Sequence, residues 1–206
     1  MRFTVVMASY LGEYRTAARD RDKKIVRAIN SVINQSFTDW EMIVVADGCQ
    51  KTMDIVSKVK DLRVKSIMVD RDKLWSGGPR NKGIELAQGE FIVYLDVDDL
   101  YGNNHLKEIN EGLNGFDWVW FDDVRYSVKN DEWYQNLCDI MVIGKHGTSN
   151  ICHKKSLPYR WDHKGYAHDH YFIKHLRQNS NYKKIAGGEY YVCHLPDSTL
   201  GKGYDL

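Results

Sequence analysis

The chain has 206 residues, 43% of them hydrophobic, and it carries 29 basic against 28 acidic side chains. This composition suits a globular protein with a core, and the near balance of charge argues against a dedicated polyanion-binding protein. The four cysteines lack CxxC spacing, which is typical of reduced thiols in a cytosolic protein. The sequence contains no run of about 18 apolar residues, so no membrane span is expected. We therefore expect a cytoplasmic protein, either free or peripheral at the inner face of a membrane.

The first half of the chain alternates between apolar runs and amphipathic stretches. Strands are expected at residues 3–9, 40–48, 63–69 and 91–95, and helices at residues 20–37, 51–60 and between the loop 76–83 and residues 87–90. Such alternation implies right-handed βαβ crossovers and a mostly parallel, Rossmann-like α/β sheet flanked by helices. Ligands of open α/β sheets bind beyond the carboxyl ends of the strands. Polar residues follow the strands there: Ser9 and Tyr10, Asp47, and the run from Asp96 to Asp99.

The second half is less regular and more aromatic. Residues 117–126 suit a strand pair or one long strand, residues 168–178 a helix, and residues 188–194 a last strand. Because these segments are not separated by repeats, linkers or low-complexity sequence, the chain is not divided into independent domains.

Three carboxylates crowd into the stretch "YLDVDDL" at residues 94–100. Strands disfavour Asp, and neighbouring like charges repel, so the cluster needs an explanation. Mg²⁺ or Mn²⁺ is typically held by one or two carboxylates together with substrate phosphates; the alternative is a solvated acidic turn. An EF-hand is excluded because Lys107 stands at the twelfth loop position, where Glu is required. The sequence also contains no Walker loop and no G-x-G-x-x-G.

Four linked segments resemble the family 2 inverting glycosyltransferases of the GT-A fold. They are "SVINQSF", a strand ending in "ADG", the loop "RNKG" and the run "GEFIVYLDVDD", and with the first strand they span roughly residues 3–100. The resemblance implies a GT-A fold with a smaller, mixed acceptor-side region. It also implies a single domain over residues 1–206, in which residues 1–100 bind the nucleotide sugar and residues 101–206 form the acceptor side.

The resemblance assigns the donor-binding residues position by position. Asp47 matches the carboxylate that reads the nucleotide base, and Ser9 and Tyr10 match residues that line the nucleotide pocket. Arg80 matches a donor-site arginine. The alternatives are a simple Asp-Gly turn at Asp47 and a surface residue at the start of a helix at Arg80. The family usually has a second Asp at position 46, where this chain has Ala46.

The same resemblance identifies the metal site. Asp96 and Asp98 match the Asp-x-Asp pair that bridges the ribose and the metal-bound diphosphate, with Mn²⁺ or Mg²⁺ as the ion. Asp99 is a second candidate ligand, so the metal assignment is shared between Asp98 and Asp99. His194 falls where several members bring a histidine to the metal; the alternative is a structural histidine.

The general base is expected in the second half of the chain. The segment "AHDHYFIKHLR" resembles the Glu-Asp catalytic segment of the family, with His168 where Glu is usual, so Asp169 matches the catalytic Asp. Asp169 could instead cap its helix, and Asp162 or His168 would then be the base. A zinc site of His163, His168 and His170 is disfavoured because it lacks paired cysteine ligands.

The resemblance implies a metal-dependent inverting transferase that moves a hexosyl or pentosyl group from a nucleoside diphosphate sugar to an acceptor hydroxyl. A UDP-sugar is favoured as donor and a GDP-sugar is the second choice. The acceptor is expected to be a glycan or a lipid-linked glycan, and a hydroxylated DNA base stays open. The alternatives are a nucleotidyltransferase, which would release pyrophosphate instead of a nucleoside diphosphate, and a non-catalytic sugar-nucleotide or glycan-binding module, which would show no turnover.

Overall fold

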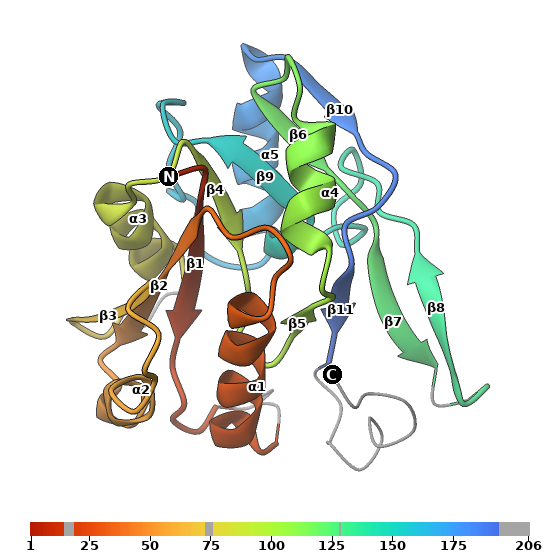
Figure 1. Cartoon of the computed structure of the whole chain (residues 1–206). Coiled ribbons are helices and arrows are strands. Elements are labelled where there is room, and N and C mark those ends of the chain that lie inside the picture. Colours follow the sequence, from red (N-terminus) through yellow and green to blue (C-terminus); the bar gives the residue numbers. More distant parts are fainter. Residues whose placement is uncertain (15–18, 73–75, 128, 194–206) are drawn as a thin grey trace.

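The computed structural model describes residues 1–14, 19–72, 76–127 and 129–193, which fold into two sheets flanked by helices (Figure 1). The first half contains β1 (Phe3–Ser9), α1 (Arg21–Ile33), β2 (Trp40–Asp47), α2 (Gln50–Val56), β3 (Val64–Val69), α3 (Gly77–Leu86) and β4 (Phe91–Tyr94). The second half contains β5 (Leu100–Tyr101), α4 (His105–Gly112), β6 (Trp118–Trp120), β7 (Asp123–Ser127), β8 (Glu132–Asn136), η1 (Thr148–Asn150), β9 (Ile151–Lys154), α5 (His168–Gln178), β10 (Tyr182–Lys184) and β11 (Tyr190–Val192).

The larger sheet has seven strands in the order β10-β6-β9-β4-β1-β2-β3. β1 pairs in parallel with both β2 and β4, and β2 with β3, whereas β9 runs antiparallel to β4 and β6. The predicted mostly parallel α/β sheet is therefore confirmed. Because the chain passes from β1 to β2 and β3 and then returns to β4 on the other side of β1, the strand order reverses between β1 and β4. Ligands of doubly wound sheets bind beside such a reversal.

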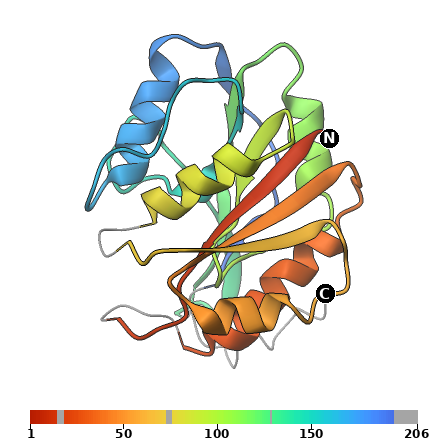
Figure 2. The same cartoon turned by 90° about the vertical axis from the view of Figure 1, so that its left-hand side faces the viewer.

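Side chains of the buried parallel strands alternate between two apolar layers. On one face Val5 and Met7 pack with α1, α2 and α4. On the other face Val6 packs with Ile84 of α3 and with residues of α5. Figure 2 shows α3 and α5 on one side of the sheet and α1 and α2 on the other. Because both faces are covered, these strands are continuous apolar runs, which is why the sequence predicted them correctly.

The first helix ends earlier than the sequence predicted. It stops at Ile33 instead of continuing to residue 37. Beyond this end, the side chain of Gln35 bonds another element. The buried Gln35 accepts a hydrogen bond from the backbone N–H of Leu106 (2.9 Å) and donates one to the carbonyl of Gly102 (2.7 Å). Gln35 thereby satisfies an N–H at the start of α4, a helix that the sequence did not reveal.

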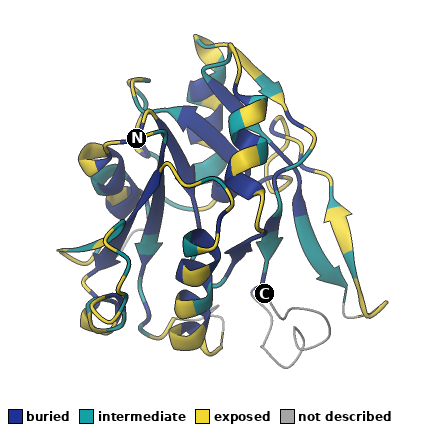
Figure 3. Ribbon diagram, in the orientation of Figure 1, coloured by how far each residue is buried: buried dark blue, intermediate teal, exposed yellow. Residues whose placement is uncertain are grey.

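The second sheet has the order β5-β11-β7-β8, and β8 lies at its exposed edge (Figure 3). The segment 117–126 forms two strands, but they join different sheets: β6 belongs to the larger sheet and β7 to the smaller one. The chain switches sheets between them at the buried Phe121 and Asp122. β8, β9 and β10 were not predicted. Among the described residues, no helix has both the length and the apolar character needed to cross a bilayer.

Two histidines are fully enclosed by the core. His105 stacks on Tyr101 with ring centroids 3.9 Å apart, and burial lowers its pKa to about 3. Burial also lowers the pKa of His153 to about 4. The Nε2 of His153 lies 2.7 Å from the hydroxyl of Tyr94 and its Nδ1 lies 2.9 Å from the carbonyl of Lys154, which suits a neutral ring that accepts from one and donates to the other.

These histidines should make the folded chain sensitive to acid. An unfolded histidine gains a proton below about pH 6.5, whereas the buried rings stay neutral, so the free energy of unfolding should fall as the pH falls. Between about pH 7.5 and about pH 5 each ring should remove roughly 2 kcal/mol. Denaturant titrations across this range test this for His105→Phe, whose pH dependence should be smaller by roughly 2 kcal/mol. An unchanged pH dependence would contradict the assignment.

Candidate active site

The three carboxylates after β4 lie in different surroundings. Asp96 is 40% exposed and Asp98 is half-buried, whereas Asp99 points inward and is only 6% exposed. Both oxygens of Asp99 accept hydrogen bonds from the β11 region: the hydroxyl of Tyr190 lies 2.6 Å from Oδ2 and the backbone N–H nitrogen of Cys193 lies 2.7 Å from Oδ1. Thus the acidic turn presents two carboxylates outward and uses the third to bind β11.

Burial raises the pKa of Asp99 well above its usual range, and the charges of Asp98 and Asp96 raise it further. The hydrogen bonds from Tyr190 and Cys193 oppose that shift. The hydroxyl of Tyr190 also accepts a weak hydrogen bond from the backbone N–H of Asp96 (3.3 Å). Tyr190 therefore connects the inward carboxylate with the start of the acidic turn.

Arg80 connects the first half of the chain with the second. The guanidinium is only 5% exposed and donates to Oδ1 of Asp96 at 3.1 Å. Its other terminal nitrogen lies 3.1 Å from Nε2 of His168, the first residue of α5. Since arginine always donates, His168 must accept with a neutral ring. Burial lowers the pKa of His168, and the positive charge of Arg80 lowers it further. The opposite oxygen of Asp96 accepts from the hydroxyl of Ser149 at 3.2 Å.

The "RNKG" segment contributes other structural residues besides Arg80. The side-chain amide of Asn81 donates to the carbonyl of Trp161 (2.9 Å) and accepts from its backbone N–H (2.8 Å). Trp161 is thereby held 5.0 Å from the guanidinium of Arg80. A Cβ on Gly83 would lie 2.4 Å from a methyl group of Val6, so only glycine lets α3 approach β1 this closely. Asn81 and Gly83 thus help to position Arg80.

The predicted nucleotide-pocket residues meet at the carboxyl ends of β1 and β2. The buried carboxylate of Asp47 pairs with the guanidinium of Arg71 and accepts from the backbone N–H of Asp72 (2.6 Å). Arg71 also lies over the ring of Tyr10, 3.6 Å from its centroid. Ser9 is buried and bonds the hydroxyl of Thr52 at 2.8 Å. Tyr10 and Asp47 are therefore joined through Arg71, which sequence reasoning missed.

Asp169 lies in the first turn of α5, next to His168. One oxygen accepts a hydrogen bond from the backbone N–H of His170 at 2.8 Å. The N-cap residue of α5 is Ala167, and no side chain caps the helix, so Asp169 is not the capping residue. Asp169 also raises the pKa of the neighbouring His146 by its charge, although burial lowers that pKa overall. The start of α5 thus places Asp169 next to His168, the residue that contacts Arg80. Asp162, the fallback base, is exposed and lies 4.0 Å from His175.

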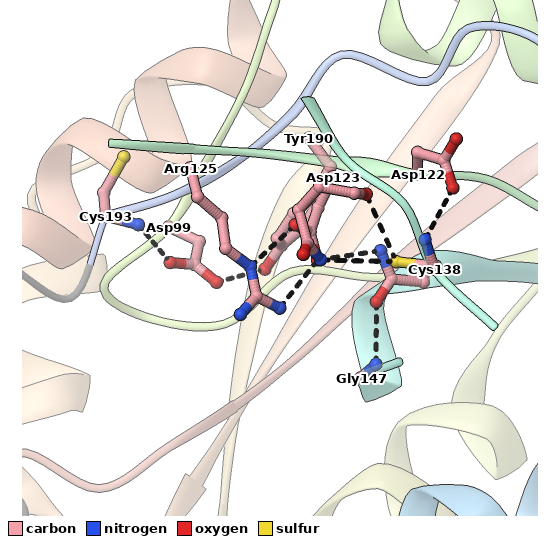
Figure 4. A network of polar contacts seen from close by, with 10 residues as sticks. Asp99, Asp122, Asp123, Arg125, Cys138, Gly147, Tyr190 and Cys193 are labelled. Atoms are coloured by element: carbon pink, nitrogen blue, oxygen red, sulfur yellow. Dashed lines mark hydrogen bonds and ion pairs between the residues drawn. The ribbon is translucent and has the colours of Figure 1, made fainter. Parts of the chain in front are cut away.

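A network of polar contacts around Asp123 joins β7 to the residues before β9 (Figure 4). Asp123 accepts two hydrogen bonds from Arg125, at 2.8 and 3.1 Å, and one from the amide of Asn150 at 3.3 Å. The carbonyl oxygen of the same amide accepts from the backbone N–H of Gly147 at 2.7 Å, which closes the turn around Ser149. Asp122 accepts from the backbone N–H of Cys138 at 2.7 Å. The network fixes η1 on β7, so the hydroxyl that contacts Asp96 comes from a rigid turn.

The predicted residues differ in how closely the structure brings them together. Asp96, Arg80 and His168 form one contact chain, and Asp47 and Tyr10 form another. His194 lies outside the described residues. Within the described part of the chain, no three His, Cys, Asp or Glu side chains are grouped so that they could hold an ion by themselves. The residues that sequence reasoning missed are Arg71, Ser149, Trp161 and Tyr190, and no local sequence signal marks any of them.

Curated relatives match parts of the chain. TarS of Staphylococcus aureus, a poly(ribitol-phosphate) β-N-acetylglucosaminyltransferase, is 31% identical over 112 residues, which cover 52% of this chain and 18% of TarS. AmsB of Erwinia amylovora, an amylovoran biosynthesis glycosyltransferase, is 27% identical over 154 residues, which cover 70% of this chain and 48% of AmsB. The chain therefore spans less than half the length of either relative.

Solved structures confirm the predicted GT-A fold. Residues 1–349 of S. aureus TarS in complex with UDP-GlcNAc match with a TM-score of 0.76 and 19% identity, over 99% of this chain and 62% of that one. The complex of the same TarS fragment with UDP gives a TM-score of 0.74 and 20% identity, over 93% of this chain and 60% of that one. The family model described as glycosyl transferase family 2 matches residues 16–184. The chain therefore belongs to glycosyl transferase family 2.

Proposed function

We propose that this protein is a metal-dependent inverting glycosyltransferase that moves a hexosyl or pentosyl group from a nucleoside diphosphate sugar to an acceptor hydroxyl. The observation that carries the proposal is the contact chain from Asp96 through Arg80 to His168, beside Asp169. It brings acidic residues after β4, a cation from α3 and a candidate base from α5 to one place. A nucleotidyltransferase or a binding module would not need the separate carboxylate on α5.

Asp96 and Asp98 suit a hard divalent cation. Mg²⁺ and Mn²⁺ commonly take one or two protein carboxylates and complete their shell with phosphate oxygens and water. Asp99 is buried, and both of its oxygens accept hydrogen bonds from Tyr190 and Cys193. Asp96 is partly exposed and accepts from Arg80 and Ser149, and Asp98 is half-buried. We assign the ion to Asp98 with Asp96 beside it. When bound, the ion would neutralise the diphosphate as it departs.

The chain's own residues supply the remaining chemistry. Arg80 adds a buried positive charge next to Asp96, on the donor side. Asp169 takes the proton from the acceptor hydroxyl as that oxygen attacks the anomeric carbon from the face opposite the leaving group. The bond from the anomeric carbon to the diphosphate breaks and the bond to the acceptor oxygen forms, so the configuration inverts. Keeping the base separate from the leaving-group carboxylates lets Asp169 stay available for the proton.

Asp47 and Tyr10 suit the nucleotide end of the donor. A carboxylate can accept the imino N–H of uracil or guanine, and an aromatic ring offers a stacking surface. The complexes of TarS with UDP and UDP-GlcNAc support a UDP-sugar as the first donor to test, with a GDP-sugar second. The acceptor is proposed to be a glycan or lipid-linked glycan. This is in keeping with AmsB, an amylovoran biosynthesis glycosyltransferase, and TarS, which transfers N-acetylglucosamine to the polymer poly(ribitol-phosphate).

Asp99 acts as a positioning residue in this proposal. Its two hydrogen bonds fix β11 against the acidic turn, and the Tyr190 hydroxyl reaches on to the N–H of Asp96. Removing that hydroxyl would leave one oxygen of a buried carboxylate without its donor. Such a loss costs about 1–3 kcal/mol, and the turn that presents Asp98 would relax.

The first test concerns the metal and the donor. Asp98→Asn keeps the shape of the side chain but removes its charge, so Mn²⁺-dependent binding of UDP should weaken by about tenfold or more, which is about 1.4 kcal/mol. Calorimetry with UDP and Mn²⁺ measures it directly, and a panel of nucleotide sugars screened by thermal shift with Mn²⁺ identifies the donor. Unchanged metal-dependent affinity in the folded variant would remove Asp98 from the site.

The second test concerns the base. The amide oxygen of Asn can accept the hydrogen bond from His170 as the carboxylate does, so Asp169→Asn should fold normally and bind the donor as before. Loss of a general base typically slows the reaction by about 10²–10⁴-fold, and we expect a decrease of at least about a hundredfold in the rate of transfer. The readout is release of the nucleoside diphosphate with the identified donor and acceptor. Near-normal turnover would move the assignment to Asp162 or His168.

The third test concerns positioning. Tyr190→Phe should lower the free energy of unfolding by about 1–3 kcal/mol and weaken Mn²⁺-dependent UDP binding about fivefold, which is about 1 kcal/mol. Tyr101→Phe is the matched control, because Tyr101 is equally buried and its hydroxyl donates to the backbone carbonyl of Tyr94 instead of a carboxylate of the acidic turn. If both variants lose stability but bind UDP and Mn²⁺ equally, Tyr190 has only a structural role.

A further inference from the structure

A short loop between β8 and η1 exposes apolar side chains. At its tip Met141, Val142 and Ile143 follow one another and are 58%, 45% and 49% exposed. Leu137, just before the loop, is 72% exposed. Single exposed apolar residues are ordinary, but consecutive ones on a soluble surface generally mark an interaction site. We call residues 139–145 the apolar loop.

The apolar loop is a defined turn and not an extended linker. The backbone N–H of Asp139 donates to the carbonyl of Lys145 at 2.9 Å, which closes the loop at its base. The backbone N–H groups of Val142 and Lys145 donate to the carbonyls of Asp139 and Val142, both at 3.2 Å. The carboxylate of Asp139 accepts from the backbone N–H of Met141 at 2.8 Å. These bonds hold the three apolar side chains at the outside of the turn.

Aromatic residues flank the apolar loop. Tyr166 is 75% exposed, and its hydroxyl lies 3.2 Å from the position that a Cβ on Gly144 would take. Tyr171, on α5, is 37% exposed and stacks on His163 with ring centroids 3.9 Å apart. Tyrosine suits the boundary between water and an apolar phase because its ring is apolar and its hydroxyl is polar.

Cations outnumber anions on the same surface. Lys145 ends the apolar loop, and Lys164 lies two residues before Tyr166; both side chains are exposed, as are the acidic side chains of Asp139 and Asp162. On α5 a hollow of about 330 Å³ is lined by His170, Lys174, Arg177 and Gln178, with no acidic residue among them. Lys145, Lys164, Lys174 and Arg177 thus outweigh Asp139 and Asp162, whereas the whole chain has a formal net charge of only +1.

The hollow and the apolar loop are joined next to the candidate base. Nε2 of His146, one residue beyond the apolar loop, lies 3.2 Å from Nδ1 of His170, and the two rings stack with centroids 5.4 Å apart. His170 follows Asp169 directly in α5. The surface therefore borders the side of the site on which the acceptor is proposed to enter.

We propose that the apolar loop docks this protein onto a membrane surface that carries anionic lipid headgroups. Met141, Val142 and Ile143 enter the boundary between headgroups and acyl chains. Tyr166 lies at the level of the headgroups, and Lys145 and Lys164 meet their phosphates. An apolar tip surrounded by cations is the combination that gives reversible binding to anionic bilayers. A second copy of the chain fits less well, because the cations of two such surfaces would face each other.

The test places a fluorescent reporter at the tip of the loop. All four native cysteines are buried, so an Ile143→Cys variant can be labelled there with an environment-sensitive dye. Leu62→Cys is the matched control, since Leu62 is 93% exposed and lies in the turn before β3. With vesicles of equal parts phosphatidylglycerol and phosphatidylcholine, the dye at position 143 should shift to shorter wavelength and the dye at 62 should not. Vesicles of phosphatidylcholine alone, or added salt, should reduce the shift.

Co-sedimentation with the same vesicles gives a second measurement. Replacing Met141, Val142 and Ile143 together by Ser should lower vesicle binding by about tenfold or more, whereas Leu62→Ser should leave it unchanged. Both variants should bind UDP and Mn²⁺ like the unaltered chain, so failure of this inference and failure of the proposed function are distinguishable. No binding of the unaltered chain to anionic vesicles, or equal dye shifts at positions 62 and 143, would overturn the proposal. A dimer in solution that the triple variant dissociates, without vesicle binding, would make the surface a contact between copies.

Discussion

The hydrogen bonds that Asp99 accepts from β11 determine how the two sheets meet at the site. Three carboxylates in four positions repel one another, and an inward carboxylate must be stabilised by donors or it will not stay buried. Tyr190 of β11 and Cys193, the residue directly after that strand, supply those donors. The same bonds leave Asp96 and Asp98 facing outward. These two hydrogen bonds thus stabilise the buried carboxylate, fix β11 and orient the acidic turn. The site and the second sheet therefore depend on each other.

The donor half could be predicted because its signals are local. Strands buried on both faces are continuous apolar runs, and their carboxyl ends meet at one edge, which brought Ser9, Asp47 and Asp96 into one prediction. Arg80 was assigned by the family resemblance. The acceptor half could not be predicted in detail. β9 and β10 have only four and three residues, too short for a periodic pattern. Ser149 reaches Asp96 only because β9 pairs antiparallel with β4, a pairing between distant segments that no local pattern encodes.

Several residues of the family-like motifs hold the geometry instead of facing a ligand. Gln35 joins the end of α1 to the start of α4, and the buried hydroxyl of Ser31 accepts from the backbone N–H of Tyr101 at 3.1 Å. Asn81 holds Trp161 over α3, and Gly83 lets α3 approach β1. From the sequence alone these positions cannot be distinguished from ligand contacts, because both uses require a particular side chain. The structure separates them by burial and by partner.

The nucleotide end of the site contains a competition that follows from charge and stacking. Arg71 covers one face of Tyr10 and pairs with Asp47, so a base that stacked on that face and donated to Asp47 would have to displace the guanidinium. The side chain of Arg71 is 35% exposed but that of Asp47 only 6%, so removing the guanidinium would leave a buried carboxylate without its countercharge. Asp47 would keep its hydrogen bond from the N–H of Asp72 during the exchange. The carboxylate is therefore positioned before a base arrives, and the base must replace the hydrogen bond that Arg71 gives up.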